Sequence, residues 1–225
     1  MAKAIRNHGL SIFFGTIFLL ALAGQSIAGL LVFNEEQQVH GSAAVGYLDF
    51  ITSSAFVVDV AENWQSEYLQ FFLFILATVW LVEKGSPESK KVEDAGVGDD
   101  ESELIGPHAR ADSPKWARAT DWRNFVYSNS LLLMMGAVFL ASWLVQSIAG
   151  MVVYNQDQLD HSASAISWAQ YVVNPDFWNR TLQNWQSEFL AVGSMVALSI
   201  YLRQRGSAES KPVGAPHEAT AVESE

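Results

Sequence analysis

The chain repeats itself at a fixed offset of 121 residues. The string Gln-Ser-Ile-Ala-Gly occurs at 25–29 and again at 146–150, and Asn-Trp-Gln-Ser-Glu occurs at 63–67 and again at 184–188. Because both strings recur at the same offset, no insertion separates the two copies over this span. A fixed internal period predicts that each copy is one structural unit and that the units pack against each other.

Long uncharged segments indicate that the chain enters a membrane. Half of the 225 residues are hydrophobic and 16% are charged, which is apolar for a soluble protein. Residues 10–33 and 128–156 contain no charged side chain, and each segment exceeds the roughly 20 residues that cross a bilayer core as a helix. Residues 68–82 and 189–202 are also uncharged but shorter.

Each of the shorter segments is preceded by a tryptophan. Trp64 and Trp185 extend the segments outward by about one helical turn, and we predict that they are anchors at the membrane interface. The predicted fold is all-α, a four-helix transmembrane bundle built from a tandem two-helix repeat with helical outer loops. Its predicted parts are a first repeat at 1–90 with spans at about 10–33 and 64–82, a flexible cytoplasmic linker at 91–112, a second repeat at 113–211 with spans at about 128–154 and 185–203, and a disordered tail at 212–225.

The distribution of Lys and Arg predicts the orientation of this bundle. Twelve of the 13 lie before the first span, between the second and third, or after the fourth, and the two remaining loops hold only Arg180. Both termini and the linker are therefore expected in the cytoplasm, with the loops around 34–63 and 155–184 outside. Because each copy crosses twice, the copies enter the membrane in the same direction, which predicts a parallel pseudo-two-fold axis along the membrane normal.

The N-terminal segment has a second interpretation. Lys3, Arg6 and the apolar run after them resemble a secretory signal sequence, with small residues at 21–23 or 26–28 for cleavage. However, the same Gln-Ser-Ile-Ala-Gly string ends the third apolar segment, deep inside the chain, where signal peptidase has no role. We therefore expect the first helix to belong to the mature fold.

The outer loops contain helix signals and aromatic residues. Asn34 and Asn155 open the two loops and predict a helix end or a new N-cap. Ser53 and Asn174, which Pro follows, predict the start of the second helix of each copy. Aromatic side chains predict that part of each loop lies along the bilayer surface, namely Tyr47, Phe50 and Phe56 in one copy and Trp168, Tyr171, Phe177 and Trp178 in the other.

Polar residues near the outer ends of the predicted spans are the leading site candidates. They are Gln25 and Glu67 in the first copy, and Gln146 and Glu188 in the second. Acidic groups at membrane depth are costly and suggest a function. Gathered around the pseudo-axis, these residues could bind a cation or relay protons. They could instead form an interhelical hydrogen-bond lock, and we favour this second hypothesis.

Two histidines each follow an acidic residue at a spacing of four. His40 follows Glu36, and His161 follows Asp157. Such a pair shares one face of a helix, and two pairs could supply four ligands to an ion such as Zn²⁺. Patterns such as His-x-x-x-His are absent, and acid–His pairs are common on polar surfaces. We therefore predict no metal site and no cofactor.

Two cytoplasmic segments have a distinct composition. The string Gly-Ser-Pro-Glu-Ser-Lys at 85–90, which returns with Ala in place of Pro at 206–211, predicts a membrane-exit turn. Its recurrence leaves a partner-docking role open. After the linker, Asp-Ser-Pro at 112–114 starts a short basic helix with Trp116 and Trp122, which we expect to rest on the inner leaflet rather than on nucleic acid.

The Trp-Gln-Ser-Glu string within residues 62–70 and the Gly-Ser-Pro-Glu-Ser string within 85–90 together point to a family. The chain resembles small bacterial integral membrane proteins that are grouped as a domain of unknown function, over nearly all of residues 5–211. The resemblance implies a location in the bacterial inner or plasma membrane and brings no activity or cofactor. The second copy departs at Ala191 and Ala208, where the first has Gln and Pro, which suggests that the copies differ in role.

Together these features predict a non-enzymatic accessory or structural membrane protein. It would pack in the lipid bilayer with itself or with a membrane-protein partner. The alternative is a small ion or solute carrier, or a channel subunit, that uses the outer-leaflet Gln and Glu residues. A weaker hypothesis is a membrane enzyme with a metal at His40 and His161.

Overall fold

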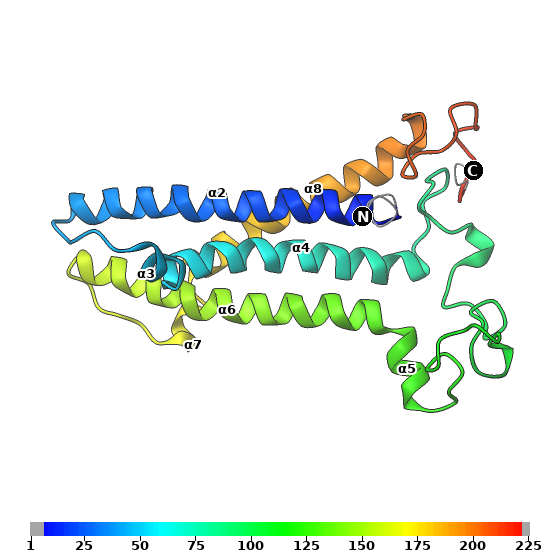
Figure 1. Ribbon diagram of the computed structural model, residues 1–225, viewed down its shortest axis with the longest axis horizontal. Coiled ribbons are helices and arrows are strands. Elements are labelled where there is room, and N and C mark those ends of the chain that lie inside the picture. The colour runs from blue at the N-terminus through cyan, green and yellow to red at the C-terminus, as the bar shows by residue number, and fades with distance from the viewer. Residues whose placement is uncertain (1–6, 222–225) are drawn as a thin grey trace. The chain divides into compact units, whose positions relative to one another are not determined.

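The protein is all-helical in its computed structural model, which describes residues 7–221. In this part of the chain, long helices alternate with short ones (Figure 1), and no strand occurs. The α-helices are α2 (Gly9–Val39), α3 (Tyr47–Ile51), α4 (Ser54–Trp80), α5 (Trp122–Ser128), α6 (Ser130–Asp160), α7 (Trp168–Tyr171) and α8 (Pro175–Tyr201). The linker adds two short 3-10 helices, Val92–Asp94 and Gly106–His108. Lys3 and Arg6, on which part of the predicted orientation depends, and the last four residues of the predicted tail lie outside the described residues.

The second long helix of each sequence copy begins at the predicted start signal. Asn174 is the N-cap of α8, where its side chain accepts a hydrogen bond from the Asp176 amide at 2.9 Å and Pro175 takes the first helical position. The Ser53 hydroxyl accepts from the Phe56 amide at 3.3 Å at the start of α4. Both start signals are therefore confirmed. As a result, α4 and α8 begin about ten residues before the predicted spans 64–82 and 185–203.

The helix bounds follow the 121-residue offset of the sequence. Helix α2 covers 9–39 and α6 covers 130–160, while α4 covers 54–80 and α8 covers 175–201. Among the described helices, α2 and α6 are long and apolar enough to cross a membrane, judged by length and composition. The first halves of α4 and α8 instead carry several charged side chains.

Asn34 and Asn155 do not end their helices, which corrects the prediction. Each lies inside its helix, one to two turns before the C-terminus. The Asn34 side chain donates to the Val45 carbonyl at 3.1 Å and accepts from the Val45 amide at 2.7 Å. Asn155 makes the same pair of bonds with Ile166, at 2.9 and 2.8 Å. The amide thus fastens the returning loop to the helix while the helical backbone continues past it.

The chain forms two compact units. Unit 1 comprises residues 1–60 with 145–171, and unit 2 comprises residues 61–144 with 172–225. Unit 1 contains α2, α3 and α7 with the start of α4 and the end of α6. Unit 2 contains α5 and α8 with the larger part of α4 and the first half of α6.

In unit 1, the short helix α3 packs against the Gln-Ser-Ile-Ala-Gly string of α2. The chain turns back after α2 to reach α3 (Figure 1). The hydroxyls of Ser26 and Tyr47 lie 2.8 Å apart and share a hydrogen bond. A Cβ atom at Gly29 would lie 2.9 Å from the Phe50 ring, so glycine is required for this approach. The close neighbour of the string at this point is therefore an aromatic ring of α3.

Helix α7 packs against the second copy of the string in the same way, also in unit 1. The Trp168 indole donates to the Ser147 hydroxyl at 2.9 Å, and a Cβ at Gly150 would lie 2.6 Å from the Tyr171 hydroxyl. Tyr171 is 1% exposed and Phe50, its counterpart in α3, is 3% exposed. These two rings are therefore buried against the long helices, whereas Tyr47 and Trp168 are exposed; placement of the loops along a bilayer surface stays a prediction.

Candidate functional site at the contact of α4 and α8

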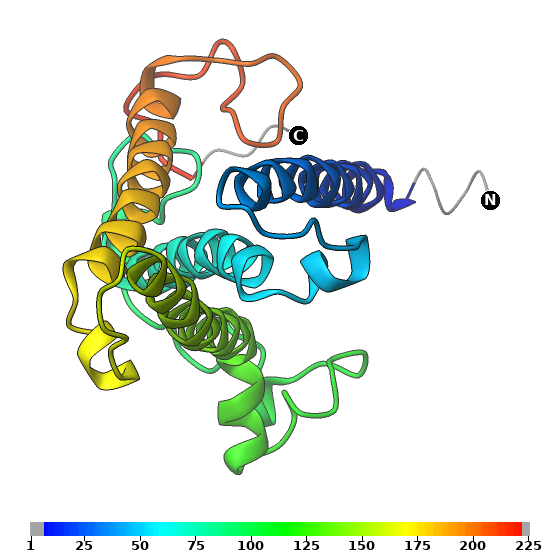
Figure 2. The ribbon, with the colours of Figure 1, turned by 90° about the vertical axis from the view of Figure 1, so that its left-hand side faces the viewer.

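In unit 2, the Asn-Trp-Gln-Ser-Glu strings lie where α8 runs at an angle to α4 (Figure 2). The contact begins with an ion pair between Arg180 Nη1 and Glu62 Oε2 at 3.5 Å. Arg180 also pairs through Nε with Asp176, one turn earlier on α8, at 3.4 Å. The only Arg or Lys of the predicted outer loops therefore joins the two helices.

One turn further along α4, Gln65 is completely buried. Its side-chain oxygen accepts a hydrogen bond from the Trp185 indole nitrogen at 2.8 Å, and its side-chain nitrogen donates to the Glu62 carbonyl at 3.0 Å. Both ends of the amide are thus satisfied, as the burial of a polar group requires. The bond joins the Gln of the first string to the Trp of the second.

Aromatic rings surround Trp143 of α6, next to this bond. The Trp143 ring lies 5.5 to 6.1 Å, centroid to centroid, from four others, which belong to Phe139, Phe177, Trp178 and Trp185. Aromatic pairs at such distances stabilise beyond the area that they bury. Because these rings come from α6 and α8, the cluster fixes α8 against α6 as the Gln65 bond fixes it against α4.

The predicted polar residues are distributed over both units. Glu67 is exposed and Glu188 is half-buried, and the two carboxylates of unit 2 lie close enough to repel each other. In unit 1, Gln25 is exposed and Gln146 is 1% exposed. A site formed by all four residues stays a prediction.

Gln65 was not among the predicted site residues, although it lies in the repeated Asn-Trp-Gln-Ser-Glu string. The predicted site residue of this string was the charged Glu67. The phase of α4 decides which polar residue faces the neighbouring helix, and it turns Gln65 inward and Glu67 outward.

The two copies of the motif are used differently. Trp185 is half-buried and bonded to Gln65, whereas Trp64, its counterpart, is 40% exposed. Gln186, the counterpart of Gln65, is exposed. Anchoring of Trp64 and Trp185 at a membrane interface stays a prediction.

The histidine candidates lie at the ends of α2 and α6. The His161 ring nitrogen lies 3.4 Å from an Asp157 carboxylate oxygen and 2.8 Å from the Asp157 carbonyl, with both side chains exposed. His40 is the C-cap of α2, and its amide donates to the Glu36 carbonyl. Within residues 7–221, no three His, Asp or Glu side chains gather as metal ligands would.

The two predicted exit turns of unit 2 share one hydrogen-bond pattern. Ser89 accepts from the amide six residues earlier at 2.8 Å, and Ser210 does so at 2.9 Å. Ser86 and Ser207 each accept from the amide two residues later, at 3.3 and 3.2 Å. The repeated string thus encodes a repeated local fold.

The exit turns meet through a pair of carboxyl groups. Glu88 of the first turn is hydrogen-bonded to Glu209 of the second. This bond, partial burial and the charge of Glu209 raise the pKa of Glu88 to about 7. Two carboxylates can form such a bond only if one of them is protonated, so the contact holds a proton near neutral pH.

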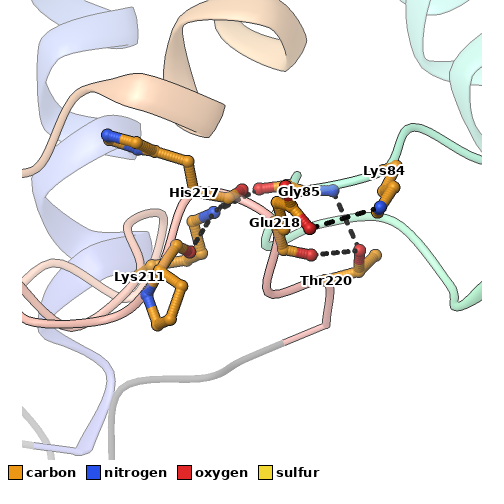
Figure 3. A network of polar contacts seen from close by, with 7 residues as sticks. Lys84, Gly85, Lys211, His217, Glu218 and Thr220 are labelled. Carbon is orange, nitrogen blue, oxygen red and sulfur yellow. Dashed lines mark hydrogen bonds and ion pairs between the residues drawn. The ribbon is translucent and has the colours of Figure 1, made fainter.

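Lys211 clasps the C-terminal tail onto the first exit turn (Figure 3). Its side chain is 1% exposed, and its ammonium donates to the carbonyl of Gly85 and to three carbonyls of the tail, those of Pro216, His217 and Ala219. Burial and the nearby charge of Arg203 lower the pKa of Lys211. These bonds fasten part of the tail, residues 216–219, to the first exit turn, while disorder of the tail at 212–225 stays a prediction.

The backbone of Gly85 completes the clasp. Its amide donates to the Thr220 hydroxyl at 2.9 Å, and Lys84 beside it pairs with Glu218 at 3.5 Å (Figure 3). Gly85 has a φ of +92°, and a side chain there would collide with the His217 carbonyl. Glycine therefore serves both the turn and the approach of the tail.

These observations define an all-helical protein in which two of the described helices have the length and apolar composition to span a membrane. The chain belongs to the family described as "Domain of unknown function (DUF6766)", whose model matches residues 1–222. No curated protein and no solved structure matches the chain.

Proposed function

We propose that this protein is a multi-pass protein of the bacterial plasma membrane, with a non-enzymatic, accessory or structural role. In this proposal each sequence copy crosses the bilayer twice, so that four helices form a bundle with both termini in the cytoplasm. The common offset of the helix bounds and the one-sided distribution of Lys and Arg support this topology. A second copy of the chain or another membrane protein is the expected partner.

The bond between Gln65 and Trp185 is the observation that carries the structural role. The most characteristic string of the sequence supplies its buried polar group to helix packing, and both ends of that group's amide are bonded within the protein. Polar bonds between helices hold membrane proteins together where the hydrophobic effect is weak. We therefore infer that the motif was selected to fix the geometry of α4 and α8.

A small cation carrier or channel subunit is the second candidate function. The proximity of Glu67 and Glu188 favours it, because two carboxylates that repel each other attract a cation between them. In this candidate the pair would bind the cation near the outer leaflet. A bundle of four helices encloses little room, so conduction would require several copies of the chain.

Ion flux in proteoliposomes separates the two functions. The purified chain is reconstituted under a K⁺, Na⁺ or proton gradient, alongside the double variant Glu67→Gln/Glu188→Gln. The structural role predicts the same leak as empty liposomes for both proteins. Flux through the wild-type chain that the double variant abolishes would overturn the structural role and establish the carrier. The variant Glu83→Gln, which removes a carboxyl group three residues beyond the C-terminal end of α4, is the charge control.

A further inference from the structure

The segment of residues 110–125, called the basic aromatic arm below, is folded although it adjoins the linker. Ala117 is buried, and its carbonyl accepts hydrogen bonds from the Gly106 amide at 2.8 Å and from the Asn124 side chain at 2.9 Å. The rings of Trp116 and Trp122 pack edge to face, with centroids 5.7 Å apart. These contacts fix the loop before α5 onto α5 itself, so that the arm presents one defined surface.

Large aromatic side chains of the arm point into solvent. Trp122 is 66% exposed, Phe125 is 67% exposed and Trp116 is 42% exposed. Tryptophan is enriched where a bilayer meets water, because its ring is apolar and its N–H is polar. Three such rings on one short folded segment are more than scattered surface apolarity.

The arm is basic in an acidic chain. The whole sequence has a net charge of −11, whereas residues 110–125 contain four cations and two anions. Arg123 pairs with Asp121 at 3.0 Å. The other cations, Arg110, Lys115 and Arg118, are exposed on the same segment. A surface of this charge is complementary to anionic lipid headgroups.

The arm is placed directly before a helix that can span a membrane. Helix α5 ends at Ser128, Asn129 interrupts the helical backbone, and α6 begins at Ser130. Figure 1 shows α5 turned away from the axis of α6. A segment that leaves the axis of a spanning helix at its end can lie along the surface of the same bilayer.

We propose that the basic aromatic arm docks onto an anionic leaflet, with its aromatic rings at the boundary of headgroups and acyl chains and its cations against the headgroups. This inference rests on the proposed membrane location of α6. Each cation near such a surface contributes a factor of about 5 in binding. Removal of the charges of Lys115 and Arg118 therefore lowers the ratio of docked to undocked arm about 30-fold.

A fluorophore on the arm tests the docking in the full chain. The sequence has no cysteine, so Ser113→Cys gives one labelling site. The labelled chain is placed in nanodiscs of phosphatidylcholine alone, or of phosphatidylcholine and phosphatidylglycerol in equal parts. We expect bromine-labelled lipid to quench the probe only with phosphatidylglycerol, and added salt to reverse the quenching.

Variants and a competitor distinguish the outcomes. Lys115→Gln/Arg118→Gln should lose the quenching, while Lys91→Gln/Arg205→Gln, which removes the same charge elsewhere, should keep it. Equal quenching in both nanodiscs, an equal loss in both variants, or displacement by a single-stranded oligonucleotide would each overturn the proposal. If the chain stays soluble without detergent or nanodiscs, the membrane location fails. Sedimentation with phosphatidylglycerol vesicles then tests the arm by itself.

Discussion

The hydrogen bond between Gln65 and Trp185 predicts that one glutamine of the repeated motif is far more sensitive to substitution than its counterpart. Gln65 is completely buried and Gln186 is exposed. Gln65→Met keeps the length of the side chain but leaves the Trp185 N–H without its acceptor. Unsatisfied buried groups cost about 1–3 kcal/mol in water-soluble proteins, and bonds between membrane helices average about 0.6 kcal/mol. We expect Gln65→Met to lower the free energy of unfolding by about 1–2 kcal/mol.

Gln186→Met is the matched control, because it makes the same chemical change at the equivalent position. Exposed substitutions stay within about 0.5 kcal/mol of the wild type. Unfolding of the purified chain in detergent, followed by circular dichroism, measures both variants. For a chain of this length, 1 kcal/mol corresponds to a shift of about 2–4 °C in Tm. Equal Tm values for the two variants would refute the assigned packing.

A double-mutant cycle separates the hydrogen bond from general packing. Trp185→Phe removes the N–H and part of the ring, and the double variant with Gln65→Met removes both partners. If the bond is real, the two substitutions are coupled by about 0.5–2 kcal/mol, because the second change finds no bond left to break. A coupling of zero would show that the two side chains act independently.

Three further predictions concern the exit turns and the Gln-Ser-Ile-Ala-Gly string. Because the pKa of Glu88 is raised from 4.5 to about 7, the folded chain holds a proton that the unfolded chain releases, and stability falls as the pH rises from about 4.5 to 7. Solvent screening limits this loss of stability to about 1 kcal/mol. Unfolding curves recorded across that pH range should show a flatter decline for Glu88→Gln than for the wild-type chain. Lys211→Met should release the tail and speed its hydrogen exchange by mass spectrometry, whereas Lys90→Met, which removes a single bond to a carbonyl, should leave the tail protected. Gly29→Ala should destabilise the chain by about 1–3 kcal/mol through overpacking, while Gly24→Ala, with open space around it, should be neutral or stabilising by up to about 1 kcal/mol in the same unfolding assay.

Local signals in the sequence predicted where helices begin better than where they end. Asn174 and Ser53 cap their helices because a cap depends only on a few neighbouring residues. Asn34 has the same chemistry, yet it lies inside α2 and bonds to Val45, eleven residues away. Such a partner comes from the path of the returning loop, which a local pattern does not contain.

The candidate site shows the same limit at the level of packing. The repeated string lies at the contact of α4 and α8, but its predicted site residue was the charged Glu67, whereas Gln65 is the buried member. Likewise, composition did not predict that Lys211 lies buried among backbone carbonyls of the tail, because one such lysine has no signature in composition. Gly29 lies in the repeated Gln-Ser-Ile-Ala-Gly string, and only the structure shows that its close neighbour is the ring of Phe50.

Labelling of single cysteines tests the proposed membrane topology most directly, since the natural sequence contains none. Ser42→Cys and Ser164→Cys place a thiol in each predicted outer loop, and Asp100→Cys places one in the predicted cytoplasmic linker. A membrane-impermeant maleimide applied to spheroplasts should label the first two and should reach the third only after lysis. Protection of Ser42→Cys and Ser164→Cys, or labelling of Asp100→Cys before lysis, would contradict two hairpins that both enter from the cytoplasm.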